Sequence, residues 1–529
     1  MIIFNNQSLE VMKKYFFLIS VSLCLIKVNA QVVFTSSNLP IVVINTNNQT
    51  IVDEPRIICD MGIIWNGPGI TNNITDPYNN YNGKIAIEIR GSTSQQYPKK
   101  SYGFETVDNS GNKKNVSLLT MPKENDWILY GAYPDKTLMR NEITYDLFRK
   151  MQPWSPRFVY CELVINGQYK GVYSLMEKIK RDYNRVNIAK LDSNGNISGG
   201  YIIKIDKLTG GSSTTWTSPY QTKLKFLYHD PEYAELNTNE RNYIKNYVTN
   251  FENAVYGPNF KDSVQGYRAF INTGSFIDFM LMQELGRTVD GYRSSSFMYK
   301  DNDSKGGKLT CGPMWDFNLS YGNADYCSAF DTTGWQYNFA NVCPSFSTEP
   351  PEWWERLLED TSFANEVQCR WQFLRSTILK TTYVNNWIDS VAILLDDAQQ
   401  RNFVQWPILG VYVNWNYFVG NTYKEEINYL KWWFQSRSEY MDYYLPGNCV
   451  LPNSTSAIKN NKNPLSVFPN PTSGLLFTNI TPQSEVRIYS IDGKHVPFKR
   501  QGNTINISDL DDGYYVLVVE SKVFKIIKQ

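Results

Sequence analysis

Two aspartates stand in Val289-Asp290-Gly291-Tyr292-Arg293 and in Pro313-Met314-Trp315-Asp316-Phe317-Asn318, on either side of a segment that alternates like a β-hairpin. The predicted strands are residues 296–299 and 308–314, with polar turn residues between them. The apolar spacing before Asp290 predicts a helix that ends at Leu285. The order along the chain is therefore helix, aspartate, hairpin and aspartate.

The chain before this segment has mostly the pattern of β-structure. Strand-like alternation recurs at residues 85–90, 99–105, 158–165, 171–176 and 200–206. A polar loop at 91–98 joins the first two strands, and Asn166-Gly167 favours a tight hairpin turn. The spacing of residues 135–151 predicts a helix, with Asp135 as a candidate cap. We therefore predict a β-rich N-terminal lobe over residues 31–235.

Helical periodicity dominates the next part of the chain. Predicted helices cover residues 239–256, 273–285, 353–378 and 424–444. The hairpin between Asp290 and Asp316 is embedded among them. We therefore predict a helical C-terminal lobe over residues 236–449, which gives the body an α+β fold class.

The N-terminus has the pattern of a secretory signal peptide over residues 1–30. Lys13 and Lys14 precede an apolar run at residues 15–26, and Val28-Asn29-Ala30 is a candidate cleavage site. No later stretch is long and apolar enough to predict a transmembrane helix. These features predict export and no transmembrane segment in the mature chain.

The C-terminal end predicts a separate small domain. Residues 450–464 are rich in Asn, Ser, Lys and Pro, a composition typical of a linker. Short strands with turns at Asp492-Gly493 and Asp512-Gly513 follow. Residues 465–529 therefore predict a small all-β sandwich.

The composition excludes several classes of function. Lys and Arg total 52 and Asp and Glu total 51, which argues against a global polyanion binder and hence against a nucleic-acid partner. The chain has two histidines, His229 and His495. Multi-histidine zinc and iron sites are therefore close to excluded. Catalysis is expected to depend on carboxylates, Lys or Arg.

The cysteines fit an exported chain, in which disulfides can form. Seven of the eight remain after the signal segment, and Cys311, Cys327 and Cys343 are the most closely spaced. One local bridge is expected among these three. The odd number leaves at least one thiol free or paired elsewhere.

The motifs of the body resemble those of a known family when they are taken together. The relevant sequences are Arg90-Gly91-Ser92-Thr93-Ser94, Pro98-Lys99-Lys100-Ser101-Tyr102, Leu138-Met139-Arg140-Asn141-Glu142, Asn166-Gly167-Gln168-Tyr169-Lys170-Gly171-Val172-Tyr173, Val289-Asp290-Gly291-Tyr292 and Trp315-Asp316-Phe317. In this order they resemble the CotH (spore coat protein H) family of atypical protein kinases. The resemblance implies a kinase-like two-lobed fold and ATP-dependent phosphorylation of Ser or Thr in secreted or surface proteins.

The resemblance also implies roles for the two aspartates. Protein kinases place a catalytic Asp before such a hairpin and a metal-binding Asp after it. Asp290 is therefore expected to act as the catalytic acid or base, and Asp316 to hold Mg²⁺ or Mn²⁺. Ser295 stands where kinases have a metal-binding Asn, and Asn318 stands where many members of the family have another Asp.

The nucleotide site is expected on the first predicted strands. Arg90, Ser92 and the polar loop that follows them are candidates to contact the phosphates of ATP. Lys99 or Lys100 is expected to reach the same phosphates, and Glu142 to position that lysine. Arg140 is an alternative phosphate contact.

The tail resembles a type A sorting domain of type IX secretion. The sequences that carry this resemblance are Val467-Phe468-Pro469-Asn470-Pro471-Thr472-Ser473-Gly474, Ile488-Tyr489-Ser490-Ile491-Asp492-Gly493-Lys494, Leu510-Asp511-Asp512-Gly513-Tyr514-Tyr515 and Lys525-Ile526-Ile527-Lys528. It implies that the type IX secretion machinery recognises residues 465–529, and that the protein is secreted or held at the cell surface.

Two other functions remain open from the sequence. The departures at Ser295 and Asn318 also fit an inactive kinase fold that serves as a surface structural or adhesive protein. Paired carboxylates in an aromatic-rich chain also fit a glycan-active enzyme. Metal-dependent transfer of phosphate from ATP would separate the kinase from both.

Overall fold

The structure is a computed structural model that describes residues 32–191, 195–208, 215–449, 467–468, 470–478, 484–490, 494–519 and 522–528. The chain divides into two compact units, Met1–Leu451 and Pro452–Gln529, and each is described by itself. The predicted signal peptide at 1–30 and the predicted linker at 450–464 lie outside the described residues.

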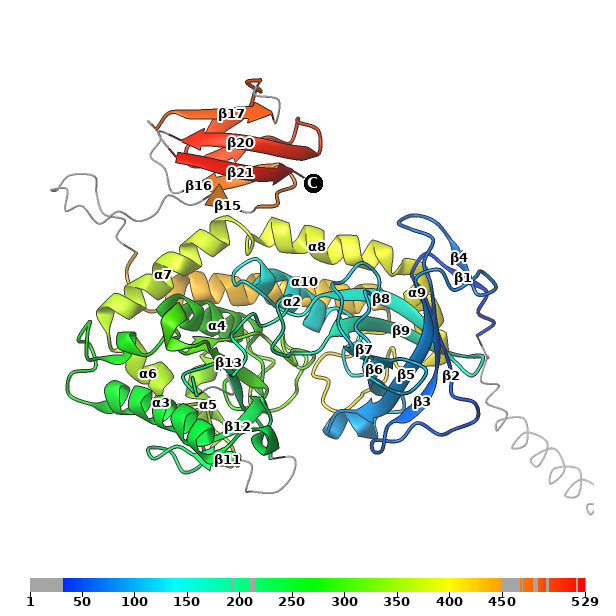
Figure 1. Ribbon diagram of the computed structural model, residues 1–529, viewed down its shortest axis with the longest axis horizontal. Coiled ribbons are helices and arrows are strands. Elements are labelled where there is room, and N and C mark those ends of the chain that lie inside the picture. Colours follow the sequence, from blue (N-terminus) through cyan, green and yellow to red (C-terminus); the bar gives the residue numbers. More distant parts are fainter. Residues whose placement is uncertain are drawn as a thin grey trace, which may run out of the picture. The chain divides into compact units, whose positions relative to one another are not determined.

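A closed β-barrel forms the first part of the larger unit (Figure 1). Its strands, in spatial order, are β2 (Ile41–Asn45), β3 (Ile57–Ile64), β5 (Tyr81–Arg90), β6 (Ser101–Val107), β7 (Asp126–Tyr130), β9 (Gln168–Glu177) and β8 (Phe158–Ile165). Alternate residues such as Ile85, Ile87 and Phe104 fill the interior. Two short strands, β1 (Ser36–Ser37) and β4 (Asn72–Asn73), pair beside the barrel.

Helix α2 (Arg140–Arg149) joins the barrel to the rest of the unit, because its apolar residues lie in the large core with side chains from β7, β8 and β9. The predicted start of this helix at Asp135 is wrong. The Asp135 carboxylate instead accepts hydrogen bonds from Thr137 and from the backbone and guanidinium of Arg140. It therefore stabilises the turn that leads into the helix.

A five-stranded sheet occupies the second part of this unit. Its order is β11 (Thr215–Thr217), β12 (Lys225–Asp230), β10 (Tyr201–Ile205), β13 (Ser296–Lys300) and β14 (Thr310–Cys311). The antiparallel pair β13–β14 confirms the predicted hairpin. Strand β10 pairs with β12, which precedes the predicted lobe boundary at residue 235, and with β13, which follows it. Strands from both predicted lobes therefore belong to one sheet.

Further helices lie in this unit, and together they supply many of the side chains of the large core (Figure 1). They are α3 (Thr238–Tyr256), α4 (Thr273–Gly286), α5 (Phe339–Val342), α6 (Trp353–Leu358), α7 (Thr361–Ser376), α8 (Thr381–Leu394), α9 (Asp396–Gln405) and α10 (Tyr423–Tyr444). Short 3-10 turns lie at Thr93–Gln96, Tyr233–Glu235, Tyr267–Ala269, Asp303–Lys305 and Gln336–Asn338. Within the described part of the chain, no helix has both the length and the hydrophobicity to span a membrane.

The predicted single helix over residues 353–378 is wrong, since it is two helices. The Asp360 side chain accepts a hydrogen bond from the backbone N–H of Ser362 and so caps the N-terminus of α7. Helix α6 has ended two residues earlier, at Leu358. Helices α8 and α9 were not predicted. Helix α8 buries only Val384 and Ile388, and α9 is only 10 residues long, so each offers a shorter apolar stripe than α10.

Two disulfides are present in the described residues. Cys327–Cys343 confirms the local bridge expected from spacing, and Cys369–Cys449 joins α7 to the segment after α10. Cys59, Cys161 and Cys311 are buried free thiols. The second bridge closes a separation of 80 residues, which sequence spacing does not indicate.

The smaller unit is all β, as predicted. One sheet contains β15 (Val467–Phe468), β16 (Leu475–Thr478), β19 (Thr504–Asn506) and β18 (Lys499–Gln501), and the other contains β17 (Val486–Ser490), β20 (Gly513–Val519) and β21 (Lys522–Lys528). Leu476, Ile488, Ile505 and Leu517 form a common core between the sheets. Two sheets that share one apolar core form a β-sandwich.

Candidate functional site

Asp290 and Asp316 lie at the two ends of the β13–β14 hairpin. Asp290 is in the turn between α4 and β13, where its carbonyl accepts a hydrogen bond from the backbone of Ser294 at 2.9 Å. Asp316 follows β14. The pKa of Asp316 is raised to about 6, first by burial and second by the negative charge of Asp290. The structure therefore brings the two predicted carboxylates into one electrostatic site.

The two carboxylate oxygens of Asp290 have different surroundings. Arg293 Nη2 donates to Oδ1 at 2.8 Å. Lys207 Nζ lies 3.7 Å from Oδ2 and belongs to a side chain that is half exposed. One oxygen is thus held by a buried arginine, while the other faces a half-exposed lysine.

Asp316 is held through the backbone by helix α2. Its own N–H donates to the Tyr145 hydroxyl at 3.1 Å, and the N–H of Phe317 donates to Asn141 Oδ1 at 2.6 Å. The Trp315 ring also stacks on Tyr145 at 5.9 Å between ring centres. These contacts position the carboxylate from residues that come about 170 positions earlier in the chain.

The backbone around the site is in unusual conformations. Tyr292, Ser295 and Asp316 have φ angles of 65°, 48° and 65°, in the left-handed region that non-glycine residues seldom adopt. Such conformations cost free energy and persist where the surrounding contacts enforce them, as they often do at functional sites. Ser295 and Asp316, the two predicted metal ligands, are both in this group.

Asp206 is a third carboxylate of the site, and sequence reasoning missed it. It follows β10, pairs with Lys204 at 2.8 Å and accepts a hydrogen bond from the Ser295 backbone at 3.2 Å. Its charge also raises the pKa of Asp316. The signal in the sequence was the alternation Lys204-Ile205-Asp206-Lys207, in which charged residues end an apolar strand.

Arg90 is the predicted nucleotide contact that faces Asp316. It ends strand β5, and its guanidinium carbon lies 5.6 Å from the centre of the Trp315 ring. Burial lowers the pKa of Arg90, whereas the negative charge of Asp316 raises it more than that of any other acid. Arg90 and Lys207 in turn lower the pKa of Asp316. The cations of the site therefore come from the ends of β5 and β10.

The two strand lysines bind different partners within the protein. Lys99 is buried, and its ammonium group donates to Val172 O at 2.6 Å and to Asn402 Oδ1 at 2.8 Å. Burial lowers its pKa to about 7. Lys100 donates to the carbonyl of Gln95 at 2.6 Å, within the loop before it. The Lys99 ammonium group is therefore held by protein groups, while Lys100 is bound to the loop that follows Arg90, and the phosphate contact expected from one of the two lysines stays a prediction.

The expected ion pair between Glu142 and a strand lysine is absent from the described residues. Ser174 donates to Glu142 Oε1 at 2.5 Å, while Oε2 is buried without a hydrogen-bond partner. Burial raises the pKa of Glu142 to about 8, so the carboxyl group is mostly protonated at neutral pH. The alternative contact Arg140 is also unsuited to phosphate, because it is fully buried against Asp135 at 2.6 Å.

The loop after Arg90 makes a tight turn. Gly91 has φ of +111°, and a Cβ there would lie 2.0 Å from Ser94 Oγ, so the position requires glycine. Ser92 precedes a 3-10 turn, and its carbonyl accepts a hydrogen bond from Gln95. The Tyr97 hydroxyl donates to the Asn414 carbonyl, which ties the end of the loop to the segment before α10.

Replacing Glu142 with Gln is expected to stabilise the protein increasingly as the pH rises. The folded-state pKa near 8 exceeds the unfolded value near 4.3, so the stability of the wild type is fully present below about pH 4 and is lost as pH rises through 8. Glutamine has no proton to lose. The variant should gain about 3 kcal/mol relative to wild type at pH 7 and none at pH 4. Urea unfolding at both pH values measures the difference, and destabilisation at pH 7 would instead indicate an ion pair.

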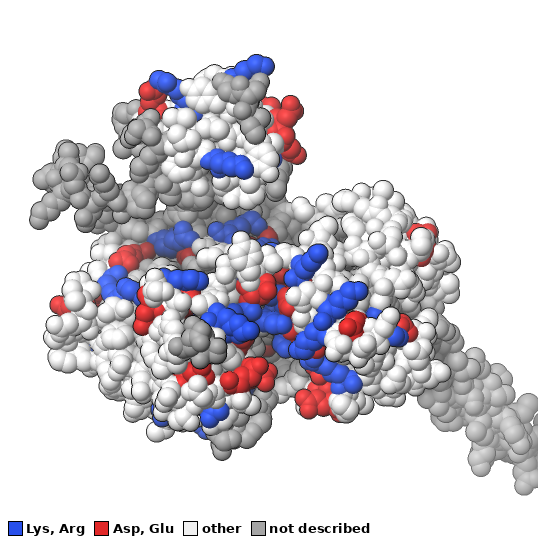
Figure 2. Space-filling view, in the orientation of Figure 1, with Lys and Arg blue, Asp and Glu red and all other residues white. Residues whose placement is uncertain are grey.

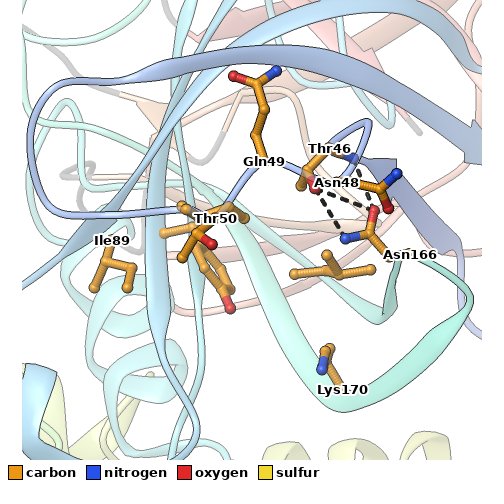
Figure 3. A pocket seen from close by; sticks show the side chains of 10 residues that line it. Thr46, Asn48, Gln49, Thr50, Ile89, Asn166 and Lys170 are labelled. Carbon is orange, nitrogen blue, oxygen red and sulfur yellow. Dashed lines mark hydrogen bonds between the residues drawn. The ribbon is translucent and has the colours of Figure 1, made fainter.

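Two surface pockets of the described residues lie elsewhere. A pocket of about 400 Å³ at the mouth of the barrel is lined by Thr46, Asn166, Lys170 and their neighbours and includes neither Asp290 nor Asp316 (Figure 3). Thr46 and Asn166 hydrogen-bond to each other at its rim. Figure 2 shows basic and acidic side chains interspersed on the visible face of the larger unit, in line with the net charge of +1.

Asp316 is the carboxylate of the site that could hold a magnesium ion bound in part by substrate. Among the described residues, no group of three or more His, Cys, Asp or Glu side chains is close enough to hold a metal. Mg²⁺ usually binds one or two carboxylates, several waters and the phosphates of its substrate. The partly buried carboxylate of Asp316, whose pKa is raised first by desolvation and then by the charge of Asp290, is a suitable ligand because a cation would offset both effects.

Comparisons with known proteins agree with these features. The CotH kinase protein family matches residues 87–441, which is more than half of the chain. The inner spore coat protein H of Bacillus subtilis (strain 168) is 28% identical over 99 residues, and the match spans 19% of this chain and a quarter of that relative. Residues 466–529 match a secretion system C-terminal sorting domain, as the tail motifs predicted.

The tail therefore implies handling by type IX secretion, export and location at the cell surface. The body match begins in strand β5 and ends in helix α10, so it includes Arg90, Asp206, Asp290 and Asp316. The chain therefore belongs to the CotH kinase protein family.

Proposed function

We propose that the chain is an exported protein kinase that transfers the γ-phosphoryl group of ATP to Ser or Thr hydroxyls of secreted or surface proteins. The observation that carries this proposal is the convergence of Asp290 and Asp316 at the ends of one hairpin, with Arg90 and Lys207 as the nearby cations. This order of elements is the one that protein kinases use. The barrel and the helical part would then correspond to the two lobes of a kinase-like fold.

Asp290 would act on the acceptor hydroxyl. Because Arg293 holds Oδ1, Oδ2 is the oxygen left to orient the hydroxyl and to accept its proton. The hydroxyl oxygen forms a bond to the γ-phosphorus, the bond between that phosphorus and the bridging oxygen breaks, and ADP leaves with the bridging oxygen. Positioning and charge stabilisation account for most of the catalysis in such a transfer.

Asp316 would hold the divalent metal, with Ser295 and Asp206 beside it. When bound, Mg²⁺ or Mn²⁺ supplies positive charge to the phosphate oxygens of ATP. Arg90 would neutralise phosphate charge from the opposite wall, since its guanidinium already faces Asp316. The Gly91–Tyr97 loop, with Ser92, would cover the phosphates.

Residues 1–30 would direct the chain across the inner membrane, and residues 465–529 would be read by the type IX secretion machinery. The linker at 450–464 would separate the sorting domain from the kinase body. An exported protein would therefore be the substrate.

The proposal is tested with the full mature chain, γ-labelled ATP and either Mg²⁺ or Mn²⁺. The expected result is metal-dependent label on Ser or Thr of exported proteins or of the chain itself, located by mass spectrometry. Chelation of the metal should remove the label. Absence of transfer with both metals, together with no ATP binding by calorimetry, would favour an inactive surface protein built on the same fold.

A further inference from the structure

Arg293 is a buried cation three positions after Asp290, and all three of its nitrogens are used. Nε donates to the Val289 carbonyl at 2.9 Å, Nη1 to Thr348 Oγ1 at 2.7 Å and Nη2 to Asp290 Oδ1 at 2.8 Å. The side chain is 1% exposed. A buried charge is tolerated only where it is paired and hydrogen-bonded, so these contacts fix the guanidinium in one place.

Two phenylalanine rings lie against the same guanidinium. The centres of the Phe339 and Phe346 rings are 4.4 Å and 4.5 Å from the Arg293 guanidinium carbon. Both distances are within the range of a cation–π contact. Phe339 and Phe346 also contact each other edge to face at 5.5 Å. The aromatic pair therefore adds to the hydrogen bonds in holding the Arg293 guanidinium in place.

Phe339 belongs to the segment that the Cys327–Cys343 disulfide closes, and Phe346 follows this segment by three residues. The Cys343 N–H donates to the Phe339 carbonyl at 2.8 Å, and the Phe346 N–H donates to the Cys343 carbonyl at 3.2 Å. Val289, the residue before Asp290, lies in the same small apolar cluster as Phe339. The disulfide thus connects directly to both rings and indirectly to the turn that carries Asp290.

We propose that Arg293 is the positioning residue of Asp290, and that the loop closed by Cys327–Cys343 clamps Arg293 for this role. The arginine occupies Oδ1 and leaves Oδ2 toward the open side. Lys207 is the competing partner, since its Nζ already lies 3.7 Å from Oδ2. Without the clamp, Oδ1 would lose its fixed partner, and the carboxylate would turn into a closer ion pair with Lys207 that masks the oxygen needed for the acceptor.

The inference rests on the proposed function only for its catalytic consequence. Its structural part, that the disulfide loop restrains the Asp290 turn, can be measured in a protein that transfers no phosphate. The chain also offers a matched control, because Cys369–Cys449 joins α7 to the segment after α10 and contacts neither Arg293 nor its aromatic pair.

The test compares the full chain with a Cys327→Ser/Cys343→Ser variant, a Cys369→Ser/Cys449→Ser variant and Arg293→Lys. Hydrogen exchange is followed at the amides of Gly291, Arg293 and Ser294, whose N–H groups bond within the turn. Initial rates at varied ATP separate kcat from KM. Arg293→Lys keeps the charge and loses the planar fork that spans Asp290 and Thr348.

The expected result is about tenfold faster exchange of the turn in the Cys327/Cys343 variant and in Arg293→Lys, with exchange in the control variant unchanged. Where the wild type transfers phosphate, kcat should fall about 10- to 100-fold in these two variants while KM for ATP stays within about twofold. Unchanged exchange of the turn in the Cys327/Cys343 variant, or an equal change in the Cys369/Cys449 control, would overturn the clamp. A wild type without transfer would refute the proposed function and leave the exchange result to decide the clamp.

Discussion

Asp290→Asn is expected to lower kcat for phosphate transfer by about 10²- to 10⁴-fold, the usual contribution of a positioned general acid or base. The amide keeps the size of the carboxylate, and its oxygen can still accept the hydrogen bond from Arg293 Nη2. It has no basic oxygen for the proton of the acceptor hydroxyl. Binding of ATP with Mg²⁺ should change little, because the proposed metal and phosphate contacts belong to Asp316 and Arg90.

The measurement is the initial rate of label transfer at saturating ATP, combined with calorimetric titration of MgATP. A suitable control is Asp389→Asn, which removes an exposed carboxylate of α8 that pairs with Lys431 on the surface. Such surface pairs contribute about 0–1 kcal/mol to stability, so the control should retain wild-type kcat. Equal rates for wild type and Asp290→Asn would contradict the role of Asp290.

Asp316→Asn is expected to affect activity and stability in opposite directions. Loss of the carboxylate should abolish metal-dependent ATP binding and reduce transfer by about 10²- to 10³-fold, because the charge that holds the metal is gone. Without divalent metal, however, the variant should be more stable than the wild type at pH 7.5 by about 2 kcal/mol. The substitution removes a carboxylate whose negative charge is disfavoured by burial and by the charges of Asp290 and Asp206.

The sign of the stability change follows from the pKa of Asp316. The folded-state pKa of about 6 exceeds the unfolded value of about 3.9. The stability of the wild type is therefore fully present below about pH 4, falls as the pH rises and has lost this contribution above about pH 6. Asparagine carries no such pH dependence, so the advantage of the variant should disappear at pH 4.

Urea unfolding in the presence of a chelator at pH 4 and pH 7.5 measures this effect, and a thermal shift with MgATP measures the loss of binding. A variant less stable than wild type at pH 7.5 would show that Arg90 and Lys207 stabilise the charged carboxylate more than burial destabilises it. A variant that still gains stability from MgATP would exclude Asp316 as the metal ligand.

Local patterns were sufficient for several parts of the fold. The β13–β14 hairpin and the β8–β9 hairpin were predicted because alternation and turn residues act between neighbours in sequence. Helices α3 and α10 were predicted within one or two residues, since their apolar faces repeat over many turns. Helices α8 and α9 were not predicted, because α8 buries only two residues and α9 is short, so their apolar stripes extend over few turns.

Side-chain environments were harder to predict. Lys99 appeared suited to phosphate because it begins a strand after a polar loop, yet its ammonium group is bound by Asn402, which is 303 residues away. Glu142 was expected to be charged and paired, whereas burial by distant segments keeps it protonated. Asp206 was missed because its closeness to Ser295 depends on the pairing of β10 with β13.

The sequence by itself determined the family, the order of helix, aspartate, hairpin and aspartate, and the sorting tail. These are carried by short motifs whose meaning does not depend on distant contacts. Only the tertiary structure decided that the charges of Arg90 and Asp316 interact, while Lys99 is bound by Asn402 and Lys100 by the loop that follows Arg90. Charge and burial act through space, and the groups that set them for each side chain come from strands and helices far apart in the chain.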